Sequence, residues 1–397
     1  MVQPARSSQP APDGSGWEHL MTYQPDAPSP RNVTRRPLIR RVLVWSAVLT
    51  VFALAALVMG ALLTESLGLV TVGLALATST LALGIVVPTF LWVDRLEAEP
   101  ARLLWFAFLW GALISTLMAI VLNELGVAFF GGLHEDPLVI GAVVVAPVTE
   151  EVAKGLGVLL IFLVARREFN GVTDGIVYAG IVAAGFAFVE NILYLGNAYL
   201  EVGTPGLVGL FIMRCLVSPF AHPMFTVCIG LALGLVAHRR RASSVWVVLL
   251  GLAAAVLLHA LWNYSAVAAA ESFVAIFAIV QVPLFVGFLL LLRWASRRES
   301  RLLRDLLTGY GLNGWYTPAE VAMLADPGER RRARQWARQA GGRRAERAML
   351  AFQDESGELA MVRKHVNLQG PDAHWAAREE SLLRTITAHR RIFVPGV

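Results

Sequence analysis

Charged residues are scarce in this chain. They make up 16% of its 397 residues, whereas hydrophobic residues make up 56%. A soluble domain carries about a quarter charged residues. The composition therefore excludes an ordinary soluble protein and predicts a multi-pass protein of the cell (plasma) membrane.

Cysteines are few, and no apolar segment near the start of the sequence has the pattern of a signal peptide. The two cysteines, Cys215 and Cys228, fall in one apolar segment, which excludes a disulfide framework or a thiolate zinc cluster. No hydrophobic core of a signal peptide precedes Val42. Residues 1–37, rich in proline and serine, are therefore expected to be a disordered, uncleaved cytoplasmic tail.

Long apolar runs dominate the middle of the chain. A run of about 20 residues is long enough to cross a bilayer as a helix. Eight such runs are present, at 42–63, 69–92, 103–123, 138–164, 175–197, 207–236, 245–265 and 273–293. We expect an all-α bundle of about eight transmembrane helices over residues 38–294, with a core at 138–265.

Arginine is confined to alternate connections between these runs. Fifteen arginines fall in 35–41, 93–102, 165–174, 237–244 and 293–301, and the other connections hold no Lys or Arg. Cytoplasmic loops carry such an excess, so both termini are predicted to be cytoplasmic. The net charge of +5 then reflects topology, and no nucleic-acid partner is expected.

The composition changes after Arg293. Residues 295–397 are polar and Arg-rich, and Thr317-Pro-Ala-Glu320 matches a capping box, which predicts a helix start. Arg330–Arg347 is a basic run. We expect a cytosolic C-terminal appendage, either simply solvated or docked on anionic lipid heads.

The fourth apolar run is unusual because it contains Glu150, Glu151 and Lys154. A charge at the centre of a spanning helix costs ~2.5–3.5 kcal/mol, and an aliphatic or aromatic residue returns only ~0.3–0.6. Sixteen such residues roughly balance three charges. Ionisable groups retained at this cost indicate a functional site.

Three further runs carry polar groups that apolar packing does not explain. They are Glu190 and Asn191 in the fifth run, Arg214 and His222 in the sixth, and His259 and Asn263 in the seventh. The first three runs have no charge inside them, and the eighth has only Gln281 as a polar interruption. The polar groups thus gather in one block of the chain.

Helix geometry limits how these groups can act. Adjacent Glu150 and Glu151 differ by about 100° around a helix, and Lys154 can neutralise either one. Pro147, Pro219 and Pro223 each remove a helix hydrogen bond, which is tolerated where a cavity or a neighbour satisfies the freed carbonyl. Asp174 is expected to be a helix N-cap.

Histidines and carboxylates in a dry site suit zinc, which accepts N and O ligands. A metal-bound water and a nearby Glu as general base would hydrolyse a peptide bond. We expect His222 and His259, with Glu190 or one of the paired glutamates, to hold the metal or its water. Glu151 is then the expected base, although the sequence does not decide between Glu150 and Glu151.

Four motifs in this block resemble the PrsW family of intramembrane proteases. They are Glu150-Glu-Val-Ala-Lys154, Phe186-Ala-Phe-Val-Glu190-Asn191, His222-Pro-Met-Phe-Thr and His259-Ala-Leu-Trp-Asn263. They occur in order, each on its own predicted helix. The resemblance covers about residues 90–294 and leaves the first two helices and both tails unmatched.

The resemblance implies a multi-spanning protease whose substrate is a membrane-anchored protein, in the best-known case an anti-sigma factor. It also suggests kinship with the CAAX prenyl endopeptidase and bacteriocin-processing superfamily. That superfamily has Arg and His where this chain has Lys154 and Glu190, so a prenylated substrate is not expected. A Glu/His pair that activates water without a metal stays open beside a zinc site.

Two other functions use the same residues. The buried charges would form a proton relay in an ion-coupled transporter, but no internal repeat of the kind common in transporters is evident. A non-catalytic scaffold would place the function in residues 295–397. The oligomeric state is not indicated by the sequence.

Overall fold

The computed structural model describes residues 35–96, 98–130, 136–166, 168–169, 171–237, 243–267, 269–370 and 372–393. These residues form helices and short connections, with no strand among them. This confirms the all-α class. Most of the predicted tail, residues 1–34, lies outside the described residues, and the first helix begins at Arg35, inside the expected tail.

Helices follow one another along the chain with short links, and several spans are interrupted by a π-helical turn (η2, η4, η5, η7) or a 3₁₀ turn (η6). In order, the elements are α2 Arg35–Leu67, α3 Leu69–Val93, α4 Ala101–Leu109, η2 Trp110–Ser115, α5 Thr116–Phe130, α6 Pro137–Ile140, η4 Gly141–Val145, α7 Ala146–Val164, α8 Val172–Val202, α9 Thr204–Phe211, η5 Ile212–Val217, α10 Ala221–Val236, α11 Ser243–Val267, η6 Ala270–Ser272, α12 Phe273–Ile276, η7 Phe277–Gln281, α13 Val282–Leu312, α14 Pro318–Leu324, α15 Pro327–Gln369 and α16 Ala373–Phe393.

Seven helices among the described residues are long and apolar enough to cross a membrane. They correspond to seven of the eight predicted spans, and the chain is a multi-pass membrane protein. The remaining predicted span, 138–164, is also helical throughout, from α6 through η4 to α7. It differs because it carries the three charges of α7. The number eight and the cytoplasmic placement of both termini stay predictions.

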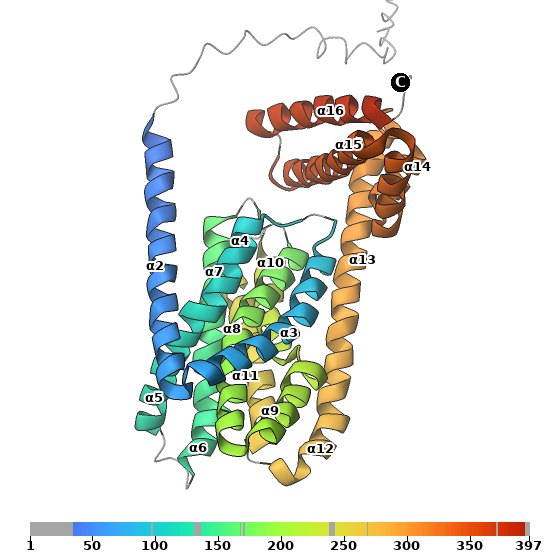
Figure 1. Cartoon of the computed structure of the whole chain (residues 1–397). Helices are drawn as coiled ribbons and strands as arrows, with labels where there is room; N and C mark the ends of the chain where they lie inside the picture. The colour runs from blue at the N-terminus through green and yellow to red at the C-terminus, as the bar shows by residue number, and fades with distance from the viewer. Residues whose placement is uncertain are drawn as a thin grey trace, which may run out of the picture. The chain divides into compact units, whose positions relative to one another are not determined.

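The chain divides into two units, Met1–Val51 and Phe52–Val397, with the boundary inside α2. The second unit contains every predicted site residue. Within it, α8 packs against α3, α4, η2, α7 and α10 and runs through the middle of these helices (Figure 1). Accordingly, 78% of the residues in an apolar 18-residue stretch of α8 are buried.

The tight contact between α8 and α10 depends on glycine. A Cβ atom on Gly175 would lie 2.0 Å from the carbonyl oxygen of Gly230, and one on Gly230 would lie 2.0 Å from that of Gly175. Only hydrogen fits at such a crossing. This close packing brings the start of α10, where a predicted site residue lies, against the helix that carries Glu190.

Proline breaks the sixth predicted span, as expected. The π-helical η5 ends at Val217, Pro219 lies in the connection, and α10 begins at Ala221. His222 therefore stands in the first turn of a new helix. In the fourth span Pro147 is the second residue of α7, which follows η4 without a break.

Asp174 is not the N-cap of α8, contrary to expectation. The helix begins at Val172, and the Asp174 carboxylate accepts a hydrogen bond from the amide of Gly171 at 3.1 Å. Asp174 lies in the first turn of the helix, and its side chain bends back to the residue that precedes the helix. It still neutralises the positive end of the helix dipole.

The C-terminal residues form a helical assembly with its own core. The predicted capping box is present, because the Thr317 hydroxyl accepts from the Glu320 amide and the Glu320 carboxylate accepts from the Thr317 amide. The basic run lies in α15, which kinks at Gly341 and Gly342. Its core is a cluster of buried apolar side chains that includes the fully buried Phe352, so this region is more than a solvated tail.

The predicted boundary at 294/295 falls inside α13, which continues unbroken from Val282 to Leu312. Leu96, from the link between α3 and α4, is buried in the C-terminal cluster. Buried Arg330 donates to the carbonyls of Leu324 at 2.7 Å and Leu96 at 3.2 Å. These contacts join the C-terminal helices to the membrane-spanning ones.

Candidate active site

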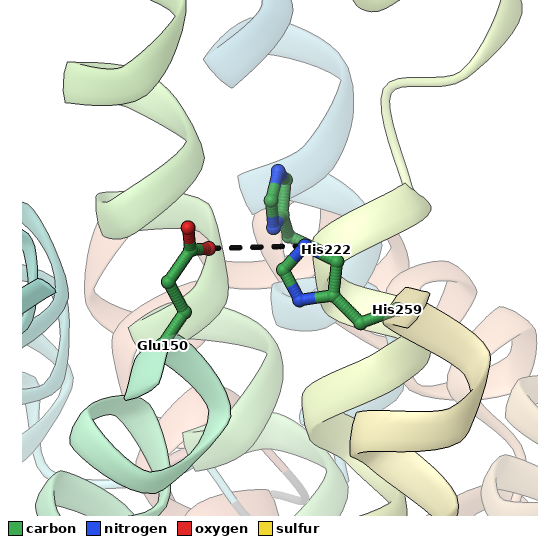
Figure 2. Close-up of side chains that lie close together, drawn as sticks. All are labelled: Glu150, His222 and His259. Carbon is green, nitrogen blue, oxygen red and sulfur yellow. Dashed lines mark ion pairs between the residues drawn. The ribbon is translucent and has the colours of Figure 1, made fainter. Parts of the chain in front are cut away.

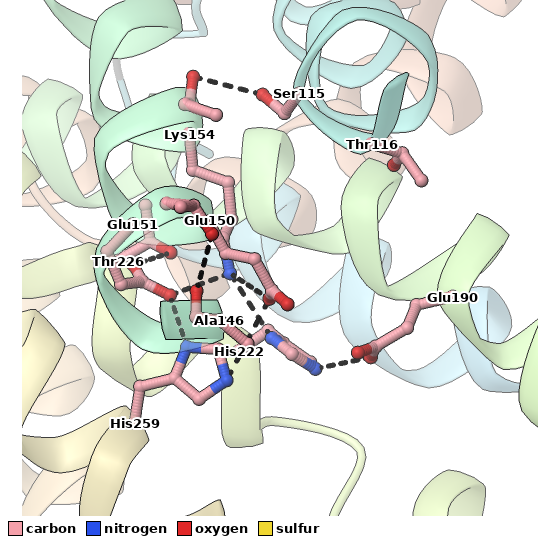
Figure 3. Close-up of polar contacts among 12 residues, drawn as sticks. Ser115, Thr116, Ala146, Glu150, Glu151, Lys154, Glu190, His222, Thr226 and His259 are labelled. Atoms are coloured by element: carbon pink, nitrogen blue, oxygen red, sulfur yellow. Dashed lines mark hydrogen bonds and ion pairs between the residues drawn. The ribbon is translucent and has the colours of Figure 1, made fainter. Parts of the chain in front are cut away.

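The charged residues of α7 all point into the bundle. Glu150, Glu151 and Lys154 are buried, and the Lys154 side chain has no exposed surface. The Lys154 ammonium lies 2.6 Å from Glu151 Oε1 and 3.7 Å from Glu150 Oε2. Its ammonium group also lies 4.1 Å from the centre of the Phe186 ring. The lysine thus binds one carboxylate directly and stands close to the other (Figure 3).

Glu151 is fully engaged by three neighbours. Besides Lys154, the Thr226 hydroxyl donates to its Oε2 at 2.8 Å, and His259 Nδ1 lies 3.1 Å from its Oε1. A buried carboxylate needs such partners, because an unpaired charge away from water is costly. Both oxygens of Glu151 are therefore occupied in holding other side chains.

Glu150 differs from its neighbour. Its Oε2 is buried and has no hydrogen-bond partner among the described residues. The nearest opposing groups are Lys154 Nζ at 3.7 Å and His259 Nε2 at 3.8 Å. Glu150 is the one of the two adjacent acids that keeps an acceptor oxygen free.

His222 lies between a cation and a carboxylate. Its Nδ1 is 3.3 Å from Lys154 Nζ, and its Nε2 is 2.7 Å from Glu190 Oε2. An ammonium group can only donate and a carboxylate only accept. Nδ1 is therefore the unprotonated nitrogen, and the Nε2 proton is donated to Glu190.

His259 is oriented by the same logic. Its Nδ1 donates to Glu151, which leaves Nε2 unprotonated and facing Glu150 Oε2 in the neutral ring. The ring stacks on Phe225 with centroids 5.0 Å apart and meets the His222 ring edge-on at 5.3 Å. Packing and hydrogen bonding together fix the direction of its free nitrogen.

Three of these groups converge on one point. One ligand atom each from Glu150, His222 and His259 lie within 4.8 Å of one another, and all three residues are buried. Figure 2 shows the carboxylate from α7 facing the two rings from α10 and α11. This group could hold a metal ion.

The donor set and the local charge fit a cation. Two unprotonated imidazole nitrogens and a carboxylate with a free oxygen are the ligands that zinc takes in catalytic sites. Each imidazole also donates its other N–H to a carboxylate, which is the usual support of a metal-bound histidine. Three carboxylates, Glu150, Glu151 and Glu190, face two cationic side chains, Lys154 and Arg214.

Glu190 was one of the expected metal ligands, but its contacts are with a histidine and an arginine. Its Oε2 accepts from His222 Nε2 and forms an ion pair with Arg214. It is absent from the group whose ligand atoms converge. Its position is that of a residue that orients His222.

The supporting residues predicted from the sequence are drawn into the same network. Arg214 donates to Glu190 and, through Nε, to Asn191 at 2.8 Å, and it lies over the Tyr194 ring. Arg214 is thus paired with an acidic neighbour, Glu190. Asn263 donates to the Ala142 carbonyl at 2.8 Å.

Three contacting residues lie within the quoted motifs but were not predicted as site residues. Thr226 holds Glu151, and Phe186 and Phe225 flank the histidines. Thr226 follows His222 by four residues and therefore shares its helix face, so its spacing could have revealed it. The aromatic residues carry no comparable signal, because such side chains line any membrane bundle.

Comparison with known proteins bears directly on this site. Residues 99–290 match the family described as PrsW family intramembrane metalloprotease. Nearly half of the chain is thus similar to the PrsW family. The matched region contains all the site residues described above, and it confirms the resemblance inferred from the four motifs.

Individual PrsW relatives are similar over the same part of the chain. Protease PrsW of Clostridioides difficile (strain 630) is 36% identical over 143 residues, which are 34% of this chain and 55% of the relative. Protease PrsW of Geobacillus kaustophilus (strain HTA426) is 32% identical over 141 residues, 36% of this chain and 57% of the relative. The chain thus spans little more than half the length of these curated relatives. No solved structure is significantly similar to the chain.

Proposed function

We propose that this chain is an intramembrane endopeptidase of the cell membrane that hydrolyses a peptide bond in a membrane-anchored protein. The observation that carries the proposal is the convergence of Glu150, His222 and His259 from three separate helices. The match of residues 99–290 to the PrsW family favours this function over an ion-coupled transporter or a scaffold. An anti-sigma-factor-like substrate is the expected class.

Glu150, His222 and His259 would hold a divalent ion, and their N,N,O donor set favours zinc. Such an ion polarises a peptide carbonyl and makes water a stronger nucleophile at neutral pH. In the alternative mechanism without a metal, the free Oε2 of Glu150 is the atom best placed to accept the proton of the attacking water. The contacts favour Glu150 over Glu151 as general base in that mechanism.

The remaining residues hold the reactive ones in place. Glu151 keeps the His259 proton on Nδ1, and Glu190 keeps the His222 proton on Nε2. The other nitrogen of each ring, Nδ1 of His222 and Nε2 of His259, is then unprotonated. Lys154 neutralises Glu151, and Arg214 neutralises Glu190. These pairs allow Glu151 and Glu190 to remain ionised although they are buried.

The proposal is tested by cleavage of a membrane-anchored reporter with purified protein in lipid. Glu150→Gln and His222→Ala should each reduce kcat by at least about 100-fold, the scale on which groups that act on the reacting atoms contribute. The matched control is Glu124→Gln, an exposed acid on α5, which should cleave like the wild type. Full activity of both site variants would overturn the proposal.

A chelator arm separates the two mechanisms left open by the sequence. If a zinc ion is bound, removal of the metal should abolish cleavage, and added zinc should restore it. Cleavage that is insensitive to a chelator, combined with loss of activity in Glu150→Gln, would instead support direct activation of water by the Glu/His pair.

A further inference from the structure

Much of the surface of the helix that carries His259 is exposed, although one side of it packs on α10. In an apolar 18-residue stretch of α11 only 11% of the residues are buried. Large side chains such as Val245, Leu250 and Leu257 are exposed on this helix. His259 itself is 1% exposed. Besides its packing on α10, polar contacts hold this helix against the fourth span.

One such contact lies a single turn beyond His259, where Asn263 donates to the Ala142 carbonyl at 2.8 Å. Ala142 belongs to the π-helical η4, in which the amide of Ala146 bonds to Gly141, five residues back, and not to Ala142. The donor for Ala142 in the π-helical pattern would be the nitrogen of residue 147. That residue is Pro147, which has no N–H.

The Ala142 carbonyl therefore has no donor from its own helix in either pattern. A buried peptide oxygen without a partner is costly in a membrane. Asn263 supplies the missing hydrogen from α11. The π-helical turn and the proline together leave the Ala142 carbonyl oxygen as an acceptor on the fourth span. It lies about two turns before Glu150 and Glu151.

A second amide holds the same end of α11 from another side. Gln281, the last residue of the π-helical η7, donates through Nε2 to the Ser265 hydroxyl at 2.6 Å. The Ser265 hydroxyl uses its own hydrogen on the Trp262 carbonyl at 2.7 Å. Ser265 can therefore only accept from Gln281, so this contact too has a defined direction.

We propose that Asn263 is a positioning residue for His259, and that Gln281 supports it. By binding the Ala142 carbonyl, Asn263 ties α11 to α7 and keeps His259 Nδ1 on Glu151 and its Nε2 toward Glu150. This inference rests on the proposed function for its effect on turnover. The tie between the two helices can be tested separately.

The test compares Asn263→Leu, which keeps the volume and removes the donor, with Asn197→Ala, an exposed position on α8. Loss of one interhelical hydrogen bond is worth about 3- to 20-fold, so Asn263→Leu should lower kcat of reporter cleavage by that factor and change KM little. Gln281→Leu should have a smaller effect in the same direction. Asn197→Ala should match the wild type.

Pro147→Ala provides a rescue that general loss of packing would not show. It restores an N–H that can bond to the Ala142 carbonyl in the π-helical pattern. Asn263→Leu should therefore lower kcat less in the Pro147→Ala background than in the wild-type background. Equal losses in the two backgrounds would overturn the proposed role.

Amide hydrogen exchange in lipid nanodiscs measures the tie without reference to activity. Asn263→Leu should speed exchange in a peptide covering 138–148, whereas Asn197→Ala should not. Unchanged exchange would overturn the tie even if cleavage were affected. A wild-type protein that fails to cleave any reporter, yet shows the exchange effect, would refute the proposed function and leave the tie between α11 and α7 standing.

Discussion

Replacement of Lys154 by Met should show how strongly the buried charges of α7 depend on one another. Lys154 is completely buried and lies 2.6 Å from Glu151 and 3.7 Å from Glu150. Lys154→Met keeps much of the length of the side chain and removes its only charge. Glu151 would then retain two partners, the Thr226 hydroxyl and His259.

The expected cost follows from breaking a buried ion pair on one side only. Removal of one partner destabilises a protein by about 3–5 kcal/mol, because the other charge is left uncompensated, whereas replacement of both partners is often nearly neutral. Lys154→Met alone should therefore lower the unfolding free energy by about 3–5 kcal/mol. Glu151→Gln combined with Lys154→Met should recover most of that loss.

The assay is reversible unfolding of the two single variants and the double variant in detergent, analysed as a double-mutant cycle. A coupling energy of about 2 kcal/mol or more is expected for a contact of this kind. Additive losses, with a coupling energy within about 0.5 kcal/mol of zero, would refute the view that Lys154 stabilises Glu151 as an ionised group.

Three further predictions concern other parts of the chain. Arg214→Leu leaves Glu190 with His222 as its remaining ion partner and should lower kcat of reporter cleavage about 10- to 100-fold, as loss of support for a metal ligand does; unchanged kcat would contradict this. Burial raises the pKa of the Asp94 carboxyl from 3.8 to about 8, against the lowering by the hydrogen bond from the Glu99 amide. The folded chain then keeps a proton that the unfolded chain releases, so stability should fall as the pH rises from about 4 to 8. Asp94→Asn should remove that part of the slope in thermal unfolding, and an unchanged slope would count against it. Arg330→Ala removes two buried hydrogen bonds to carbonyls and should destabilise the C-terminal helices by about 2–3 kcal/mol, measured as faster proteolysis of residues after 312; wild-type resistance would contradict it.

Much of the fold follows from the sequence because lipid restricts what an apolar run can do. A run of about 20 apolar residues must satisfy its own backbone, so its helical form is nearly dictated. The fourth span shows where that signal weakens. Glu150, Glu151 and Lys154 place it outside the seven clearly apolar helices, yet the same charges are the strongest pointer to the site.

The pairing inside the site could not be predicted, because it depends on how each helix is rotated. From spacing alone Lys154 can reach Glu150 or Glu151 equally well. In the structure it binds Glu151 closely and leaves Glu150 with a free oxygen. That difference comes from Thr226 and His259, which reach Glu151 from two other helices.

The π-helical turns could not be predicted from the sequence either, although a proline indicates the position of one of them. Pro147 indicates that a carbonyl about one turn earlier lacks a donor, and in a regular α-helix that carbonyl would be the one of Val143. The π-helical turn shifts the bonding by one residue, so Ala142 is the carbonyl that Asn263 reaches. In the C-terminal region, the capping box at Thr317 was visible from the sequence, whereas the core around Phe352 depends on contacts between distant helices.

The proposed function requires one buried centre in which acids and imidazoles from separate helices bind a metal and cleave a peptide bond. The most direct measurement is the zinc content of purified wild-type protein and of His222→Ala/His259→Ala, taken on the same samples as reporter cleavage. We predict about one zinc per wild-type chain with active cleavage, and neither zinc nor cleavage in the double variant. Equal zinc content and equal cleavage in the two proteins would contradict the account.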